Sequence, residues 1–288
     1  RGNLNNDIDM PLTLTRLQDH QFAVVELGAS RAGEIAYLSG IARPHVAVLN
    51  NAGHAHLEGF GDLQGVARAK AEIILGLADD GCFVFNADDR WSPLWCELAQ
   101  GRRTYSFGMR RKADVWSPET GPEIRWQDNA FLSRFPVNTP QGELEVELQL
   151  AGRHNQMNAL AAVAAAQMAG AGPQELRAGL ERVRPVKGRL YPLAGRDGIG
   201  LIDDSYNANP DSVAAAIEVL ACAPGRRFLV LGELAELGPG TDAFYRGIGE
   251  QAKTAGIDSL YALGRAGLAA ESFGPGGRRF EHLQRLID

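Results

Sequence analysis

The chain has 288 residues, of which 45% are hydrophobic and 22% are charged. These proportions are typical of globular proteins and exclude a disordered, collagen-like or coiled-coil protein. The net charge is -6, and the basic residues form no continuous block, which argues against a protein that coats nucleic acid. The cysteines, which have neither a paired nor a metal-ligand spacing and so favour a reducing cytoplasm, are Cys82, Cys96 and Cys222.

The chain is long enough to hold two hydrophobic cores. Its most apolar stretch, residues 159–172, is too short to span a bilayer, so we expect a cytoplasmic protein without membrane insertion. Residues 1–7 resemble a loop from the middle of a chain, without an initiator Met, and residues 280–288 stop within an amphipathic helical pattern. We therefore expect a fragment of a longer protein.

Five short apolar runs, each followed by a polar or glycine-rich loop, suggest the fold class. Continuous apolar residues predict strands that are buried on both faces, as in a parallel sheet, and helical patterns lie between them. In such sheets ligands bind beyond the carboxyl ends of the strands, which is where the polar loops lie. A polar loop can follow any strand for solvation alone, but five such loops together indicate an α/β protein with a ligand site. The runs are residues 22–25, 46–49, 82–85, 199–202 and 228–231.

The pattern changes between residues 102 and 150, where alternating and aromatic segments predict antiparallel strands at the edge of the first sheet. An alanine-rich helix over residues 156–171 and a shorter one over 173–183 follow. The Pro and Gly of residues 183–189 indicate a linker. We therefore predict a larger α/β domain over residues 1–189 and a smaller one over 190–288.

Two groups in the first domain could bind a metal. Glu26 ends an apolar run, where a carboxylate must be hydrated, hydrogen-bonded or metal-bound. His54 and His56 form a His-x-His pair, but no third imidazole or thiolate that would support zinc lies nearby. Magnesium would suit a histidine less well, since that ion prefers oxygen ligands. These residues alone leave hydration and metal binding both open.

Lys70 lies in the middle of the apolar stripe of a predicted helix, four residues after Val66 and four before Ile74. A lysine there must extend its amine to solvent, form an ion pair or be modified. The chain has only four lysines, so Lys70 is not one of many on a basic surface. A buried amine with a lowered pKa is nucleophilic and can react with carbon dioxide, which turns a cation into an oxygen ligand. Arg68 and Glu72 are predicted to form a surface pair.

Two helix starts carry more polar residues than capping requires. Asn155 is predicted to cap the alanine-rich helix, although a helix amino terminus beside His154 and Arg153 also suits an anion or a purine. Asn209, directly before Pro210, is predicted to cap the helix that follows residues 199–202. Capping does not account for the polar residues just before it.

Six ordered motifs together resemble the Mur ligases over nearly the whole chain. Within that family, the segments HAHLEGFG and DDSYNANP are similar to those of the members that add D-alanyl-D-alanine to UDP-N-acetylmuramoyl-tripeptide. The motifs are NNAGHAHLEGFG (50–61), AKAEI (69–73), GRHNQMN (152–158), KGRL (187–190), DDSYNANP (203–210) and GELAELG (232–238).

The resemblance implies an ATP-dependent, Mg²⁺-dependent amide ligase of peptidoglycan precursor synthesis, acting through an acyl phosphate that the incoming amine attacks. It implies an ATPase-like central domain and a Rossmann-like carboxyl-terminal domain, in a monomeric enzyme of the bacterial cytoplasm. By the same resemblance, Glu26 and His56 would hold magnesium, and Lys70 would be a carbamylated lysine that organises the metals and the acyl phosphate.

The nucleotide and the dipeptide would be bound by residues of both predicted domains, so that ATP would bridge them and favour closure near residues 187–188. Phosphoryl transfer needs charge clamps and in-line positioning rather than a covalent nucleophile. The resemblance places Asn155 and Asn158 at the base, Arg189 at the phosphates and in catalysis, Asp204 at the ribose, and Asn207 and Asn209 on the dipeptide side.

The chain departs from the family pattern in ways that leave alternatives open. The Gly-rich phosphate loop is absent from it, so we expect the fragment itself to bind ATP weakly and to be inactive. Tyr245 stands where the family often has His, and Asp9 where it has Gly. The alternatives are another Mur-type amino-acid ligase, a non-catalytic nucleotide-binding or scaffolding module, and a dinucleotide-dependent dehydrogenase, which ranks last because no Gly-x-Gly-x-x-Gly follows a strand.

Overall fold

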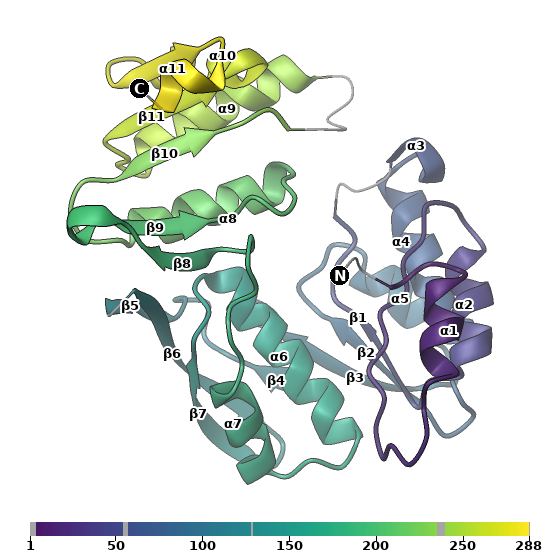
Figure 1. Cartoon of the computed structure of the whole chain (residues 1–288). Helices are drawn as coiled ribbons and strands as arrows, with labels where there is room; N and C mark the ends of the chain where they lie inside the picture. Colours follow the sequence, from purple (N-terminus) through teal and green to yellow (C-terminus); the bar gives the residue numbers. More distant parts are fainter. Residues whose placement is uncertain (1–3, 54–56, 128, 235–239, 288) are drawn as a thin grey trace. The chain divides into compact units, whose positions relative to one another are not determined.

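The computed structural model describes residues 4–53, 57–127, 129–234 and 240–287. The chain divides into two compact units, coloured along the sequence in Figure 1, and each is described by itself. Unit 1 comprises Arg1–Thr120, Pro136–Glu145 and Met157–Ala178, and unit 2 comprises Gly121–Phe135, Val146–Gln156 and Gly179–Asp288.

A seven-stranded sheet has the order β1-β2-β3-β4-β6-β5, with β7 also paired to β6. Neighbouring strands from β1 to β4 are parallel, whereas β6 runs antiparallel to both β4 and β5. The predicted mostly parallel sheet with antiparallel strands at one edge is therefore confirmed. The strands are β1 (Val46–Leu49), β2 (Cys82–Asn86), β3 (Arg103–Gly108), β4 (Val115–Trp116), β5 (Glu123–Gln127), β6 (Ala130–Thr139) and β7 (Gly142–Leu148).

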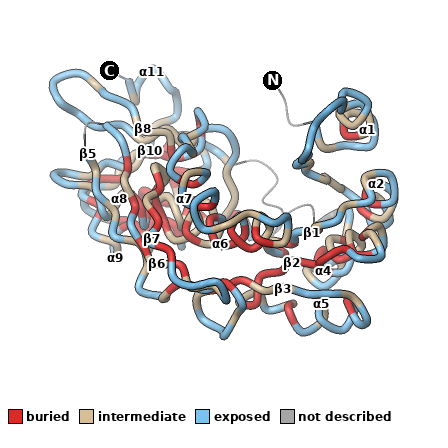
Figure 2. The backbone as a smooth tube through the Cα atoms, turned by 90° about the horizontal axis from the view of Figure 1, so that it is seen from below, coloured by how far each residue is buried: buried red, intermediate tan, exposed pale blue. Residues whose placement is uncertain are grey.

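The core of unit 1 forms around β2, whose five residues are all buried and appear in red in Figure 2. Its continuous apolar sequence therefore faces packed helices on both sides, as a central parallel strand requires. Trp95 of α5 is fully buried, and its indole N–H donates to the carbonyl of Ala67 in α4 at 3.2 Å. The elements of this part are α1 (Asp9–Leu14), α2 (Glu34–Ala42), α3 (Leu57–Phe60), α4 (Leu63–Ala71), the 3-10 turn η1 (Glu72–Gly76) and α5 (Ser92–Leu98).

Unit 2 contains a three-stranded parallel sheet, β10-β11-β12, and a hairpin, β8-β9. Helices α9 and α10 connect the parallel strands in turn, and their apolar sides form a core with α8 around Tyr245, Leu260 and Phe273. A smaller α/β unit is therefore present, as predicted. Its elements are β8 (Tyr191–Ala194), η2 (Arg196–Gly198), β9 (Gly200–Asp203), α8 (Pro210–Ala221), β10 (Phe228–Leu231), α9 (Thr241–Thr254), β11 (Ser259–Leu263), η3 (Gly264–Ala266), α10 (Gly267–Phe273), β12 (Gly277–Phe280) and α11 (Leu283–Ile287).

Two of the predicted strands differ from expectation. Residues 22–25 form no strand, and the Val24 side chain is 99% exposed, because the segment has no neighbouring strand to complete a hydrogen-bond ladder. Residues 199–202 do form most of β9, but this strand pairs antiparallel with β8, and its residues are only partly covered. An apolar run predicts a strand without specifying its partner, which is why the parallel assignment is wrong here.

The two helices predicted over residues 156–171 and 173–183 are both present. The alanine-rich helix α6 spans Arg153–Met168, so it begins three residues earlier than predicted, and α7 spans Pro173–Glu181. Residues 183–186 form no helix or strand, in agreement with the predicted linker. Among the described residues, none of the helices has the length and apolar character needed to cross a bilayer.

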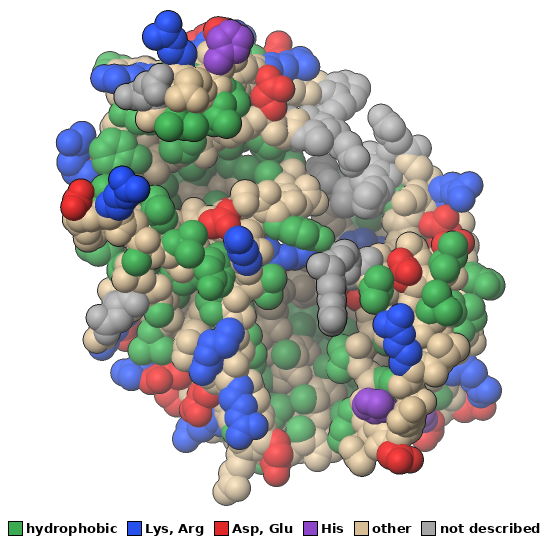
Figure 3. All heavy atoms as spheres, in the orientation of Figure 1, with side chains coloured by type: hydrophobic (Ala, Val, Ile, Leu, Met, Phe, Trp, Pro, Cys, Tyr) green, Lys and Arg blue, Asp and Glu red, His purple; other side chains and the backbone are tan. Residues whose placement is uncertain are grey.

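Charged side chains of both signs are interspersed over the face drawn in Figure 3, without a continuous basic patch.

The prediction that Glu72 forms a surface pair with Arg68 is wrong, because Glu72 binds backbone groups instead. Both carboxylate oxygens of Glu72 accept the Gly33 N–H, at 2.9 Å, and one also accepts that of Ala36, at 3.3 Å. Glu72 therefore satisfies free N–H groups at the start of α2, where a negative charge is favourable.

Candidate functional site

Lys70 lies in α4, which begins after Asp62, whose side chain accepts the Gly65 N–H at 2.7 Å. Val66 and Ile74 on the same apolar stripe are buried, and Lys70 is half-buried, as the sequence pattern predicted. Its ammonium does not simply extend to solvent, since Nζ donates to the carbonyl oxygen of Asn51 at 2.9 Å. Burial lowers the pKa of Lys70 from its usual value, and the negative charge of Asp89 partly opposes that shift.

The turn after β2 holds two carboxylates with separate partners. Asp89 accepts the Ala52 N–H at 2.9 Å and the Trp91 N–H at 2.8 Å, which connects this turn to the residues that follow β1. Asp88 instead accepts three consecutive N–H groups in the loop after β3, those of Met109, Arg110 and Arg111. The carboxyl ends of β1, β2 and β3 are therefore fixed to one another by side chains.

Of the two side chains predicted to hold magnesium, only Glu26 lies among the described residues. Glu26 is exposed, lies in an irregular segment, and accepts a hydrogen bond from the Asn5 amide at 2.9 Å. His56 and its neighbour His54 lie outside the described residues. Among the residues that are described, no group of three or more His, Cys, Asp and Glu side chains is arranged to hold a metal ion. The Glu26 carboxylate together with a protonated Lys70 amine would not suit a cation, because the amine is itself positively charged. The same carboxylate together with a carbamate on Lys70 would suit one, since both groups offer oxygen ligands.

The amino terminus of α6 brings His154 and Asn155 together. Because the helix begins at Arg153, Asn155 lies in its first turn and is not the cap that the sequence predicted. The Asn155 amide nitrogen donates to the Ala151 carbonyl at 2.8 Å and lies 3.0 Å from Nε2 of His154. Burial lowers the pKa of His154, and the nearby carboxylates of Asp204 and Glu218 oppose the shift.

Asn158 lies one turn further along α6 and is exposed. Its side-chain oxygen accepts a hydrogen bond from the amide of Asn50, the residue that directly follows β1, at 2.7 Å. Two of the recognised motifs, 50–61 and 152–158, are therefore in contact, although 108 positions separate these residues in the sequence. The side-chain oxygen of Asn50 is buried and accepts no hydrogen bond from the part of the chain that the structure describes.

In unit 2, the linker lies directly against the segment after β9. The Arg189 guanidinium stacks on the Tyr206 ring, with Cζ 4.6 Å from the ring centroid. Tyr206 N–H donates to the Gly188 carbonyl, and Leu190 N–H donates to the Asp204 carboxylate, both at 3.0 Å. The structure therefore places Arg189 and Asp204, two of the predicted nucleotide residues, in one cluster.

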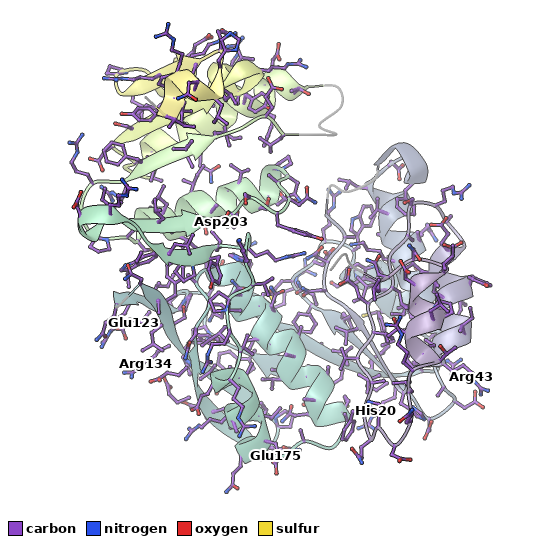
Figure 4. The ribbon with its side chains drawn as sticks, in the orientation of Figure 1. His20, Arg43, Glu123, Arg134, Glu175 and Asp203 are labelled. Atoms are coloured by element: carbon purple, nitrogen blue, oxygen red, sulfur yellow. The ribbon has the colours of Figure 1, made fainter. Side chains whose placement is uncertain are left out.

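The remaining polar residues of this segment mostly serve the local backbone. Asn209 caps α8, as predicted, because its side chain accepts the Ser212 N–H while the Ser212 hydroxyl accepts the Asn209 N–H, both at 2.9 Å. The Asn207 side chain accepts the N–H of Ala208, at 2.9 Å, and is exposed. Asp203, at the carboxyl end of β9 (Figure 4), accepts the Ser205 N–H at 3.1 Å.

The loop after β10 holds contacts that sequence reasoning missed. The Leu234 N–H donates to the buried Tyr245 hydroxyl at 2.9 Å, and the Glu233 carboxylate accepts the Arg265 N–H at 2.7 Å. Asp89 and Tyr206 were likewise not predicted as site residues. Both residues lie in loops that follow strands, which was the sequence signal for them. Their contacts could not be predicted, because Asp89 binds Ala52, far away in the sequence, and Tyr206 contacts residues of a different motif.

The sequence is similar to that of known proteins over almost its whole length. A family model described as Mur ligase middle domain matches residues 1–166, and one described as Mur ligase, glutamate ligase domain matches residues 188–286. The UDP-N-acetylmuramoyl-tripeptide--D-alanyl-D-alanine ligase of Escherichia coli (strain K12) is 42% identical over 287 residues, which cover 99% of this chain and 62% of that protein.

Solved structures give the same result. A crystal structure of MurF from Acinetobacter baumannii superposes with a TM-score of 0.89 at 36% identity, covering 100% of this chain and 62% of that one. MurF ligase from Thermotoga maritima in complex with ADP gives 0.79 at 28% identity, covering 93% and 61%. The chain thus spans about three fifths of the length of these relatives. With a family model matching more than half of its residues, this chain belongs to the Mur ligase family.

Proposed function

We propose that this protein acts in the ATP-dependent addition of D-alanyl-D-alanine to UDP-N-acetylmuramoyl-tripeptide, a step in peptidoglycan precursor synthesis and hence in cell-wall growth and division. The observation that carries the proposal is the 42% identity to the Escherichia coli ligase over 99% of the chain, which includes the Lys70 helix and the segment 203–210. In this reaction the carboxylate takes the terminal phosphoryl group of ATP to give an acyl phosphate, with ADP as the leaving group. The amine then attacks the acyl carbon, forms the amide bond and displaces inorganic phosphate, with loss of a proton.

Each cluster of residues would make a separate contribution. Arg189 would neutralise charge on the transferring phosphoryl group, and the stacking of its guanidinium on the Tyr206 ring supports a defined orientation. Asn155 and Asn158 would contact the base, and Asp204 the ribose. Asn207 would face the dipeptide, and Asn209 would support that contact mainly as the cap of α8. Lys70 is the proposed catalytic residue of unit 1.

The proposal includes Mg²⁺, held by Glu26 and His56 and organised by Lys70 after carbamylation. The half-buried, partly desolvated amine of Lys70 supports this, because a lowered pKa provides the neutral amine that reacts with carbon dioxide. Carbamylation joins the neutral amine to carbon dioxide through a new N–C bond and releases one proton. Together with the proton lost earlier from the ammonium, this replaces a positive charge with a negative carbamate. A bound magnesium ion would offset the negative charge of the phosphates and the acyl oxygen.

A ligation assay tests the proposal. The complete protein is incubated with ATP, Mg²⁺, UDP-N-acetylmuramoyl-tripeptide and D-alanyl-D-alanine, and the new amide bond is detected by mass spectrometry. We expect one ADP per product. Turnover with a single amino acid but not with the dipeptide would indicate another Mur-type ligase. Nucleotide binding without any turnover would indicate a non-catalytic module. Either of these two results would refute the proposed reaction.

The carbamate has its own test. With ¹³C-labelled bicarbonate, the protein should give a carbamate carbonyl resonance. This resonance should be lost in Lys70→Ala and retained in Lys112→Ala, since Lys112 is exposed.

We also propose that the domain boundary lies near residue 189, that the protein is a monomer, and that it is located in the bacterial cytoplasm. Light scattering of the purified protein tests the monomer directly.

A further inference from the structure

We propose that Asp89 is a positioning residue for Lys70 and acts through the peptide group between Asn51 and Ala52. The carbonyl oxygen of that peptide accepts the Lys70 ammonium at 2.9 Å, and its N–H donates to the Asp89 carboxylate, also at 2.9 Å. Because a peptide group is planar and rigid, its two ends move together. The carboxylate that fixes the N–H therefore also fixes the oxygen to which the amine binds.

Asp89 is itself held in place. Its second carboxylate oxygen accepts the Trp91 N–H at 2.8 Å, and its carbonyl accepts the Ser92 N–H at 3.1 Å. The turn directly follows β2, and the last residue of that strand, Asn86, is 7% exposed and accepts the Asp88 N–H through its side chain. Asp89 is thus anchored to the most buried strand of unit 1.

The peptide group is also well placed to transmit this constraint. Ala52 is only 8% exposed and belongs to the core cluster around β2, so its backbone cannot shift without disturbing packed side chains. Hydrogen bonds in series polarise one another, so an N–H bound by a carboxylate makes the carbonyl of the same peptide a better acceptor. The sequence alone suggests none of this, because Ala52 and Asp89 are 37 positions apart.

The alternative is that Asp89 only stabilises its own turn. Asp88 provides a matched comparison, since this neighbouring carboxylate also accepts backbone N–H groups, those of Met109, Arg110 and Arg111, but in the loop after β3. A general loosening of the turn would affect both aspartates' neighbourhoods. Positioning of Lys70 through the Asn51–Ala52 peptide involves the carboxylate of Asp89 and not that of Asp88.

The test uses ¹⁵N relaxation of the lysine ammonium groups, recorded at mildly acidic pH in this chain. It has only four lysines, and the other three, Lys112, Lys187 and Lys253, are exposed and serve as internal references. Lys70 should have the highest order parameter of the four. In Asp89→Ala it should fall to the range of the references, and the Ala52 amide should exchange with solvent at least about tenfold faster, as expected when a charge-assisted hydrogen bond is lost.

Two further variants make the result specific. Asp89→Asn keeps one acceptor oxygen for the two N–H groups of Ala52 and Trp91, so it should retain more of the order of Lys70 than Asp89→Ala does. Asp88→Ala should retain that order while altering the loop after β3. If Asp89→Ala does not fold, Asp89→Glu replaces it, because the longer side chain displaces the acceptor and should lower the order of Lys70 relative to Asp89→Asn.

Persistent order of Lys70 in Asp89→Ala, or equal order in the Glu and Asn variants, would overturn the proposal. So would an equal loss in Asp88→Ala, which would indicate a general loosening of the turn. The usefulness of this arrangement for ligation rests on the function proposed above, but the relaxation result does not. In a preparation that ligates, Asp89→Ala should lower kcat about tenfold or more without changing KM for ATP, and Asp89→Asn should restore part of that loss.

Discussion

The Arg189 guanidinium lies on the Tyr206 ring, and the Gly188 carbonyl accepts the Tyr206 N–H, so the linker is in direct contact with the segment after β9. Gly188 allows this approach because its φ is +78°, and a Cβ there would lie 3.1 Å from both the Cβ and the nitrogen of Tyr206. A site that the sequence divides between two motifs, 187–190 and 203–210, is therefore local in space.

This arrangement predicts that Arg189 cannot be replaced by lysine. Arg189→Lys keeps the charge but loses the planar stacking surface and the fork of donors, so we expect ATP affinity to fall about tenfold in titration calorimetry of the complete protein. Arg226→Lys is the matched control, because Arg226 stacks on Phe228 at 5.1 Å in the same unit but lies in none of the motifs. Equal affinities in wild type and Arg189→Lys would remove the phosphate role.

Asn209 and Asn207 should separate into a structural and a binding role. Asn209→Ala removes a capping box and should lower the free energy of unfolding by about 0.5–2 kcal/mol, whereas Asn209→Ser, which can also cap, should lose only a few tenths. Denaturant unfolding measures both. Asn207 is exposed and bonds only to the next N–H among the contacts described, so Asn207→Ala should leave stability within about 0.5 kcal/mol.

Their effects on ligation should have the opposite pattern. Asn207→Ala should raise KM for D-alanyl-D-alanine, whereas Asn209→Ser should leave it near the wild-type value. A raised KM for the dipeptide in Asn209→Ser at unchanged stability would show that Asn209 binds substrate in addition to capping α8.

The parts of the fold that depend on local sequence were predictable. Residues 46–49 and 228–231 are strands with the predicted bounds, and Asn209 caps the predicted helix, because apolar runs and capping residues act over a few neighbouring positions. Residues 22–25 have the same apolar character but form no strand, since a strand also needs a partner that the local pattern does not specify.

The candidate site was predictable as a set of residue types but not as a set of contacts. The half-buried position of Lys70 followed from its place in a helical stripe. Its acceptor, the Asn51 carbonyl, could not be predicted, because a backbone group carries no sequence signal. Likewise, Asn155 was expected to cap α6, but the helix begins two residues earlier, and its amide binds Ala151 instead.

Lys70→Ala should abolish turnover while leaving the protein folded. Alanine has a higher helix propensity than lysine and leaves the buried stripe of α4 intact, so the free energy of unfolding should change by less than about 1 kcal/mol. We expect kcat to fall by about 10²–10³ or more, the range for loss of a group that stabilises transition-state charge. Lys112→Ala, at an exposed position, is the control. Near-wild-type turnover in Lys70→Ala would leave the residue without a catalytic role.

His154 should make the stability of the protein depend on pH in a defined direction. Its Nε2 lies 3.0 Å from the Asn155 amide nitrogen, which also donates to the Ala151 carbonyl. Because an amide nitrogen only donates, this contact is a hydrogen bond only when Nε2 is unprotonated. Burial also lowers the pKa of His154 below its usual 6.5. The unfolded chain therefore binds a proton more readily than the folded one, and stability must rise with pH up to about 6.5 and then level off.

His154→Gln removes the titrating group and keeps a polar side chain of similar length, so it isolates this contribution. We expect wild type to lose stability relative to His154→Gln as the pH falls below about 6.5, by up to about 1.4 kcal/mol for each unit by which the pKa is lowered, and the difference to be constant above about 7. Urea unfolding across this range measures it, with exposed His282→Gln as the control. If wild type instead gained stability at low pH, the attraction of Asp204 and Glu218 would outweigh burial, and the pKa of His154 would be raised rather than lowered.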